Sequence, residues 1–143
     1  MSYFSTLKRA LLEPASPLPP SSVFSIYCGY AYMAGGALFL LWPGAVQAVF
    51  QESAFIGREE GLIRAIGMVL AVIGWFYIFG GRSGASQFVA ATVVDRITIV
   101  PLVLIGLVLT GVFPRVFLGV AILDPLLGII TWHLLHKERA QAV

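Results

Sequence analysis

The chain has 143 residues, of which 59% are hydrophobic and 11% are charged, and its mean hydropathy is +0.92. An ordinary soluble domain has roughly 25% charged residues, so this composition excludes a soluble globular protein. The formal net charge of +2 is too small to indicate a nucleic-acid partner. Cys28 is the single cysteine, which excludes an internal disulfide and a cysteine metal cluster. We therefore expect an all-α, polytopic membrane protein whose surroundings are membrane lipids.

Residues 1–22 are expected to form a cytoplasmic tail at the membrane interface. Phe4, Leu7 and Leu11 recur at helical spacing, with two basic residues directly after Leu7. This pattern is typical of a short amphipathic helix that lies in the interface, and a disordered tail is the alternative. An extended connector follows, because proline fixes the backbone and donates no hydrogen bond. Its prolines are Pro14, Pro17, Pro19 and Pro20.

Residues 23–143 are expected to form one transmembrane domain. They contain four apolar stretches separated by short loops. A helix needs about 20 residues to cross about 30 Å of hydrocarbon, and each stretch is close to that length. Because helices joined by short loops must turn back through the membrane, the sequence predicts an antiparallel four-helix bundle. The expected spans are Val23–Trp42, Leu62–Gly81, Phe88–Gly111 and Val116–Leu135.

The basic residues near the helix ends predict the orientation in the membrane. Most of them lie on one side, and the side richer in lysine and arginine faces the cytoplasm. Both termini are therefore expected in the cytoplasm, in a multi-pass protein of a bacterial inner membrane. The cytoplasmic residues are Lys8, Arg9, Arg82, Lys137 and Arg139, and the outer ones are Arg58 and Arg115.

The second expected helix carries a stripe of small residues. Glycines recur every seven residues, so one face is nearly smooth and lets another helix approach closely. The stripe comprises Gly67, Ala71, Gly74 and Gly81. Arg64 precedes Gly67 by three residues, which aims its side chain at a helix contact. The alternative is that Arg64 simply pairs with Glu60, four residues earlier, at the outer face of the membrane.

Asp95 and Arg96 are the most unusual residues of the third expected helix. They lie on the order of 10 Å inside its cytoplasmic edge, where a charge that faces lipid costs at least ~2.5–3.5 kcal/mol. Adjacent helical residues project about 100° apart, so each charge needs a partner of its own. Thr92 and Thr98 lie three residues on either side of Asp95 and are expected to extend its face into a polar stripe.

The fourth expected helix offers a partner for the arginine. Asp124 lies near the middle of the bilayer, within about one helical turn of the level of Arg96, so we expect these two residues to pair. Pro101 and Pro125 each leave a backbone carbonyl without its donor near the carboxylates. Thr131 continues the Asp124 face. The pattern predicts a buried polar pocket, and the alternative is a charge pair that only locks helices together.

Residues suited to catalysis or to a cofactor are scarce. His133 and His136 lack the spacing of two metal ligands on one helix face, so no metal site is expected. Ser83 lies in a turn between glycines and not in a nucleophile elbow. An enzyme is the less favoured interpretation, because it would have to work as a lipid-embedded acid–base device built from Asp95 and Asp124. No cofactor is predicted.

The chain contains three short strings, Gly57–Gly67, Val94–Arg96 and Leu123–Pro125. They resemble small bacterial four-helix membrane proteins of the BphX-like family. The resemblance covers the chain from about Gly57 onward. It implies four transmembrane helices and no established activity, so it assigns no catalytic or binding residue.

Three classes of function are compatible with these features. The first is a binding protein that holds an amphipathic or lipidic ligand between its helices, with the head group near Arg96 and Asp124. The second is a structural or accessory subunit whose charges specify a membrane assembly. The third is a small proton or ion conduit, in which several chains would surround a common pore. We favour the binding protein, with a homo-oligomer as a possible assembly.

Overall fold

The computed structural model describes residues 3–141 of the chain. Helices make up 83% of the structure, and the described residues contain no strand. Four helices are long and apolar enough to cross a membrane. The expected all-α fold with four membrane-length helices is therefore confirmed. Residues 1–2 and 142–143, the outermost parts of the two expected segments, lie outside the described residues.

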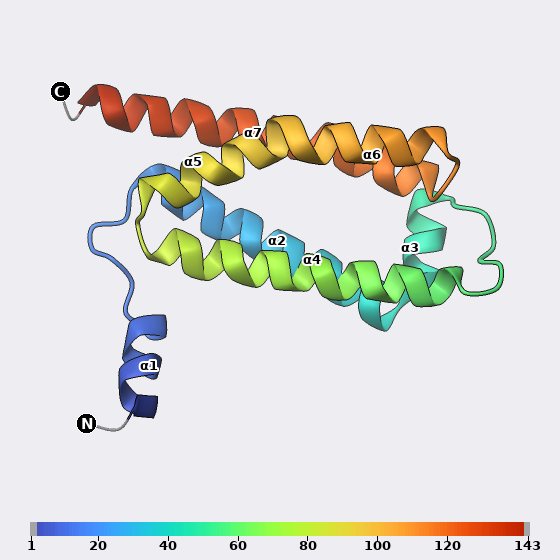
Figure 1. The fold of residues 1–143 in the computed structure, drawn as a ribbon, viewed down its shortest axis with the longest axis horizontal. Coiled ribbons are helices and arrows are strands. Elements are labelled where there is room, and N and C mark those ends of the chain that lie inside the picture. The colour runs from blue at the N-terminus through green and yellow to red at the C-terminus, as the bar shows by residue number, and fades with distance from the viewer. Residues whose placement is uncertain (1–2, 142–143) are drawn as a thin grey trace.

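The described residues form six helices, and the third long helix contains a π-helical segment (Figure 1). This composite helix consists of α5, the π-helical segment η1 and α6, which follow one another without a break. The bounds are α1 Tyr3–Leu12, α2 Pro20–Leu41, α3 Pro43–Phe50, α4 Glu59–Arg82, α5 Ser86–Val94, η1 Asp95–Ile99, α6 Val100–Leu109 and α7 Pro114–Gln141.

The predicted spans match the observed long helices closely except at the end of α7. This helix was expected to end at Leu135 but continues to Gln141. The residues after Leu135 include Lys137, Glu138 and Arg139, which are good helix formers. Two of them are basic and lie where the helix dipole favours positive charge. The predicted span ends where these polar residues begin, but the helix continues through them.

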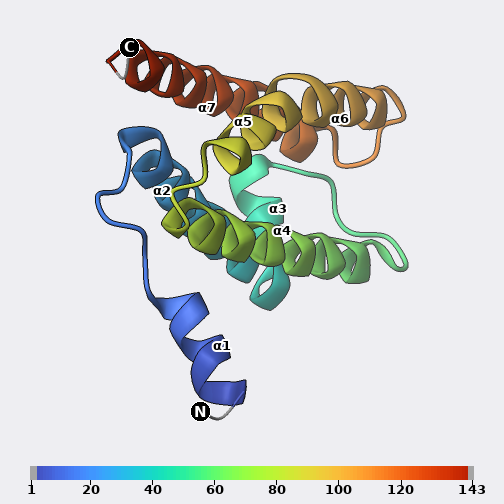
Figure 2. The same ribbon diagram turned by 60° about the vertical axis from the view of Figure 1, so that its left-hand side comes forward.

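The long helices are arranged as two pairs (Figures 1 and 2). α2 packs along α4, and the composite helix α5–η1–α6 packs along α7. Between the pairs, α2 contacts α7, and α5 contacts both α2 and α4. Each pair therefore forms its own tight interface, and the region between the pairs is the place where a cavity can exist.

The interface between α2 and α4 is built from glycines of both helices. A Cβ atom added to Gly74 would lie 2.6 Å from the Gly29 carbonyl oxygen, and one added to Gly36 would lie 2.6 Å from the Gly67 carbonyl oxygen. Real Cβ atoms do not come so close to backbone, so the helices can approach only because these residues are glycine. The whole predicted stripe faces α2: Gly67, Ala71, Gly74 and Gly81.

The π-helical segment η1 widens the composite helix at the level of the charged residues. The Val100 N–H donates to the Asp95 carbonyl, five residues earlier, which is the hydrogen-bond pattern of a π-helix. Pro101 follows directly, and its ring and missing N–H prevent the normal α-helical bond to Ile97. The composite helix therefore has a wider turn directly before Pro101, and this turn changes which side chains share a face.

An apolar cluster closes the end of the molecule at which α3 lies. Its buried members are Phe39, Val46, Ile63, Phe113, Val116 and Phe117. The loop after α3 is tied to the start of α7 by Glu52, whose Oε1 accepts hydrogen bonds from the N–H groups of Arg115 at 2.7 Å and Val116 at 2.9 Å. A carboxylate at this position satisfies unpaired donors at the helix N-terminus.

The opposite end of the bundle contains the start of α2 and the ends of α4 and α7 (Figure 1). Ser21 donates to the Glu138 carboxylate from its N–H at 2.5 Å and from its hydroxyl at 2.7 Å. Arg82 donates to the Leu12 carbonyl, and the Ala15 N–H donates to the Arg82 carbonyl at 2.9 Å. These bonds join α2 to α7 and fix the connector after α1 to the end of α4.

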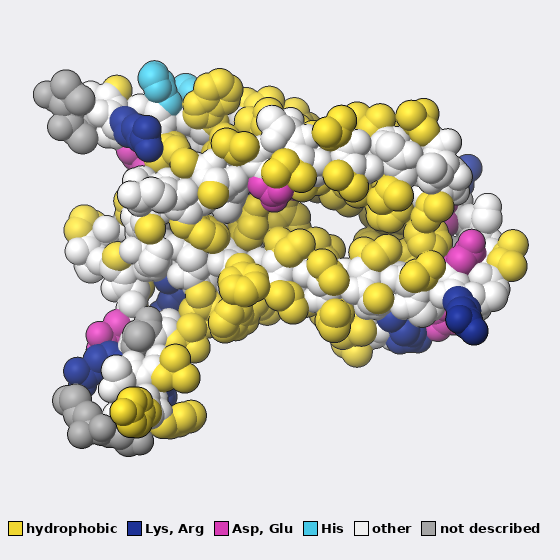
Figure 3. All heavy atoms as spheres, in the orientation of Figure 1, with side chains coloured by type: hydrophobic (Ala, Val, Ile, Leu, Met, Phe, Trp, Pro, Cys, Tyr) yellow, Lys and Arg dark blue, Asp and Glu magenta, His cyan; other side chains and the backbone are white. Residues whose placement is uncertain are grey.

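α1 stands apart from the bundle and runs across the direction of the long helices (Figure 1). Its side chains Tyr3, Phe4 and Leu7 are 96%, 75% and 66% exposed. Figure 3 shows hydrophobic atoms on one side of α1 and basic atoms on the other. This geometry suits the interfacial helix that the sequence predicts. The apolar side of α1 faces in the direction in which the long helices extend, and therefore toward the lipid that would surround them.

Candidate functional site

A cavity of about 230 Å³ separates the two helix pairs. Figure 3 shows an opening between them whose edge is covered mainly by hydrophobic side chains, with acidic atoms at one point. From α2 and α4 the lining residues are Tyr32, Phe39, Ile66, Val69, Leu70, Ile73 and Tyr77. From the other pair they are Asp95, Val100, Leu104, Val116, Phe117, Val120 and Asp124.

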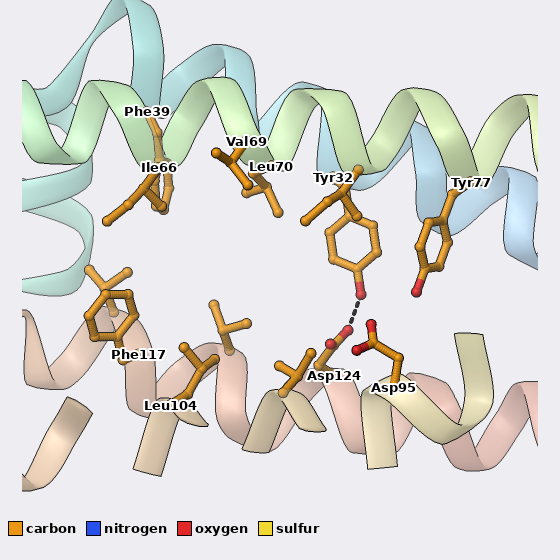
Figure 4. Close-up of a pocket in the computed structure, with 14 residues that line it drawn as sticks. Tyr32, Phe39, Ile66, Val69, Leu70, Tyr77, Asp95, Leu104, Phe117 and Asp124 are labelled. Carbon is orange, nitrogen blue, oxygen red and sulfur yellow. Dashed lines mark hydrogen bonds between the residues drawn. The ribbon is translucent and has the colours of Figure 1, made fainter. Parts of the chain in front are cut away.

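The two ends of this cavity differ in chemistry (Figure 4). At one end, the hydroxyls of Tyr32 and Tyr77 face the carboxylates of Asp95 and Asp124. At the other end the side chains are apolar, and they continue into the cluster around Phe39. The cavity thus has a polar end inside the bundle and an apolar end toward α3.

Asp124 on α7 is only 6% exposed and has two partners. The Tyr32 hydroxyl donates a hydrogen bond to Asp124 Oδ1. Arg96 Nε lies 3.7 Å from the same oxygen, which makes an ion pair. The two residues expected to pair are thus close together, and Tyr32 is a third member that the sequence analysis did not identify. Their contacts connect α2, η1 and α7.

Arg96 is fully buried, with 0% of its surface exposed. Its guanidinium carbon lies 4.4 Å from the centre of the Tyr77 ring and 5.4 Å from that of Tyr32, so both rings can stabilise the cation. Its Nη1 donates to Thr131 Oγ1 at 3.4 Å. A Cβ atom on Gly128 would lie 3.1 Å from the Arg96 Cβ, so this glycine lets η1 approach α7 closely.

The guanidinium is not fully hydrogen-bonded. Its Nε and Nη2 have no hydrogen-bond partner among the described residues, and the contact of Nη1 with Cys28 Sγ is long, at 3.7 Å. Unfilled donors on a buried cation are costly. The carboxylate of Asp124 can reduce this cost, because it lies at ion-pair distance from Nε.

Asp95 lies beside this cluster but has a different environment. It is partly buried and lines the cavity directly. Within the described part of the chain, its carboxylate has no hydrogen bond and no ion pair. The adjacent Arg96 projects toward α7 and the tyrosine rings and does not line the cavity. Arg96 thus has a partner in Asp124, whereas the separate partner expected for Asp95 is not found among the described residues.

Two of the three threonines expected on the polar faces, Thr131 and Thr98, lie in different places. Thr131 is buried on α7 and joins the cluster through Arg96, and its hydroxyl also donates to the Leu127 carbonyl at 2.8 Å. Thr98 lies outside the cavity, is exposed, and donates to the Val94 carbonyl at 2.6 Å. The π-helical turn holds about one more residue than an α-turn, so an offset of three no longer keeps Thr98 on the face of Asp95.

Arg64 and Glu60 lie outside this site, near the start of α4. Arg64 Nη2 is 2.8 Å from Glu60 Oε1, and both side chains are about half exposed, at 44% and 55%. Arg64 Nη1 also donates to the Leu40 carbonyl at 2.6 Å, at the end of α2. The pair is an exposed i,i+4 interaction, which contributes little to stability.

Tyr32, Tyr77 and Cys28 are site residues that the sequence analysis missed. Tyr32 lies three residues after Gly29 and four before Gly36, and Tyr77 lies three after Gly74. Because glycines mark the faces along which α2 and α4 meet, a tyrosine at such spacing lies on or beside the buried face. This pattern was available in the sequence.

Comparison with protein-family models finds no matching family, and comparisons with curated proteins and with solved structures find no match. The resemblance to the BphX-like family therefore stays a prediction.

Proposed function

We propose that this integral membrane protein binds an amphipathic or lipidic ligand in the cavity between its two helix pairs. The apolar chain of the ligand would lie against the apolar part of the cavity lining, which extends from Tyr32 at one end to Phe117 at the other. Its head group would lie at the polar end, beside Asp95 and Asp124. Binding, and not chemical conversion, is the proposed activity.

The observation that carries this proposal is the polarity gradient along one cavity. Carboxylates and hydroxyls gather at one end, and aromatic and aliphatic side chains form the rest of the lining. Ligand sites in proteins commonly combine a mainly apolar wall with a few polar groups that orient the ligand. An amphipathic molecule matches both ends at once.

The size and position of the cavity also fit such a ligand. Its volume of about 230 Å³ is below the roughly 300–1,000 Å³ of typical drug-sized pockets, which favours a single slender chain. Phe117 and Asp124 are seven residues apart on α7, so the lining extends about 10 Å along the helix. The opening between the helix pairs offers a lateral route from the lipid (Figure 3).

A conduit through one chain is less well supported by the same geometry. The polar groups lie at one level, and the apolar cluster that includes Phe39, Val116 and Phe117 closes the path toward α3. A proton or ion would find no polar partner along this part of the cavity lining. A structural or accessory role is the outcome that remains if the cavity binds nothing.

Native mass spectrometry of the full-length protein, released from detergent micelles, tests the proposal. Val69 and Met68 are neighbours on α4 with similar exposure, 50% and 53%, but only Val69 lines the cavity. Val69→Trp should obstruct the cavity and remove bound lipid or added decanol, whereas Met68→Trp should retain it. Equal retention by both variants, or no bound amphiphile on the wild type, contradicts the proposal.

A further inference from the structure

The balance of charge at the polar end of the cavity indicates which head group fits. Two carboxylates, Asp95 and Asp124, line the cavity, and one buried arginine, Arg96, lies behind them. Arg96 forms its ion pair with Asp124, which also accepts the Tyr32 hydrogen bond. Within the described part of the chain, one carboxylate charge therefore has a counter-ion and the other does not.

Asp95 is the carboxylate without a counter-ion. The described residues provide its side chain with neither a hydrogen bond nor an ion pair, although it is partly buried between membrane-spanning helices. A lone charge in such surroundings is strongly disfavoured unless a partner of opposite sign is present. Asp95 lines the cavity, so a bound molecule can supply that partner.

The neighbouring groups also accept hydrogen bonds. The hydroxyl oxygens of Tyr32 and Tyr77 and the carboxylate oxygens of Asp95 and Asp124 face the same space (Figure 4). A protonated amine carries several N–H donors and a positive charge, so it can contact a carboxylate and a tyrosine oxygen together. A carboxylate or phosphate head group would meet the uncompensated charge of Asp95, which has the same sign.

Arg96 does not change this preference. It is fully buried and is not part of the cavity wall, and the rings of Tyr32 and Tyr77 lie against its guanidinium. A ligand in the cavity meets Asp95 and Asp124 first. We propose that the head group which this cavity selects is a cation, a protonated amine at the end of an apolar chain, held by Asp95.

This inference rests on the proposed function and is tested with three probes that share one chain: decylamine, decanol and decanoate. Each is titrated into the full-length protein in zwitterionic nanodiscs, above neutral pH, where the amine is protonated and the acid is ionised. Ligand-dependent thermal stabilisation reports binding. The wild type should bind decylamine about tenfold more tightly than decanol, and decanoate least tightly, as a charge-assisted contact predicts.

Variants of η1 assign the preference to Asp95. Asp95→Asn should reduce the amine-to-alcohol affinity ratio to near one, and Asp95→Glu, which keeps the charge, should restore most of it. Thr98→Val is the matched control, because Thr98 lies in the same segment but outside the cavity, and it should keep the wild-type ratio. These ratios compare two ligands on one variant, so they do not depend on the stability of that variant.

The outcomes separate the two proposals. If all three probes bind equally and Val69→Trp weakens them all, the cavity binds amphiphiles but the cationic preference is wrong. If decanoate binds most tightly, Arg96 and not Asp95 selects the head group, and the inference is overturned. If no probe stabilises the protein, the proposed function fails together with the inference. Persistence of the amine preference in Asp95→Asn likewise refutes the role of Asp95.

Discussion

The Tyr32 hydroxyl on α2 donates a hydrogen bond to the Asp124 carboxylate on α7, and this contact joins the two helix pairs inside the bundle. The same tyrosine ring lies 5.4 Å from the guanidinium carbon of Arg96. One side chain therefore contacts both members of the buried ion pair. The Tyr32 hydrogen bond and the Arg96 ion pair both hold the Asp124 carboxylate at the cavity.

Tyr32→Phe is expected to destabilise the protein while keeping the ring over Arg96. A hydrogen bond to a charged group contributes about 1.5–3 kcal/mol, and its loss leaves Asp124 with Arg96 as its remaining partner. The midpoint of thermal unfolding in detergent should therefore fall. Tyr30→Phe is the control, because Tyr30 lies on the exposed side of α2, 53% exposed. An equal effect of both changes would contradict the importance of the contact.

Arg96 and Asp124 are expected to behave as one coupled unit. Arg96→Met or Asp124→Leu alone leaves a buried charge without its partner, at a cost of roughly 3–5 kcal/mol. The double variant removes both charges and should regain much of that loss. A double-mutant cycle of unfolding free energies measures the coupling. Additive losses would show that the 3.7 Å approach of these two residues has no energetic consequence.

Gly74→Leu is expected to separate α2 from α4. An added Cβ atom would already lie 2.6 Å from the Gly29 carbonyl oxygen and from the Met33 nitrogen, so backbone would have to move. Overpacking of this kind costs typically 1–3 kcal/mol or more. Val72→Leu on the exposed side of α4 should leave the unfolding midpoint nearly unchanged, because Val72 is 47% exposed. Equal tolerance at both positions would refute the tight glycine interface.

Cysteine labelling in intact bacterial cells tests the predicted orientation. In a Cys28→Ser background, a cysteine at Gln51 should react with an impermeant reagent from outside, because this residue lies at the α3 end. A cysteine at Gln141, at the opposite end, should react only after permeabilisation. The asymmetry of the basic residues is the physical reason. Labelling of Gln141 in intact cells would reverse the orientation.

Spin labels on α1 test whether this helix lies in the membrane interface. Leu7 and Lys8 are adjacent, so their side chains project about 100° apart. A label at Leu7 should be more accessible to oxygen, which concentrates in lipid, and a label at Lys8 should be more accessible to a water-soluble relaxation agent. If both labels report water alone, α1 does not bind the membrane surface.

The helices could be predicted from the sequence because their signals are local. Each membrane-spanning stretch can be recognised from its high hydropathy. The glycine stripe from Gly67 to Gly81 can be recognised from its seven-residue spacing, without knowing which helix packs against it. The proximity of Arg96 and Asp124 could be predicted because unpaired charges in lipid are costly. These arguments need only the chain and its solvent.

The rest of the site could not be predicted by the same arguments. Tyr27, Tyr30 and Tyr32 do not differ in hydropathy, and only its spacing from Gly29 and Gly36 sets Tyr32 apart. Tyr27 and Tyr30 are 67% and 53% exposed, and Tyr32 lies on the inner side. Tyrosine is tolerated at both exposed and buried positions, so the residue type alone does not show which tyrosine faces inward. Thr98 was misplaced because the π-helical turn changes the angle between side chains. The cavity exists because the two helix pairs diverge. This divergence cannot be predicted from any one stretch of the sequence.

The proposed function requires that an amphipathic chain occupies the space between the helix pairs. The most direct test is a crystal structure with tail-brominated decanol, in which anomalous scattering locates the bromine. A bromine peak is expected at the apolar end, among Phe39, Leu104 and Phe117, with the hydroxyl beside Asp124. A cavity without such a peak, filled by side chains or by a helix of a second copy, would contradict it.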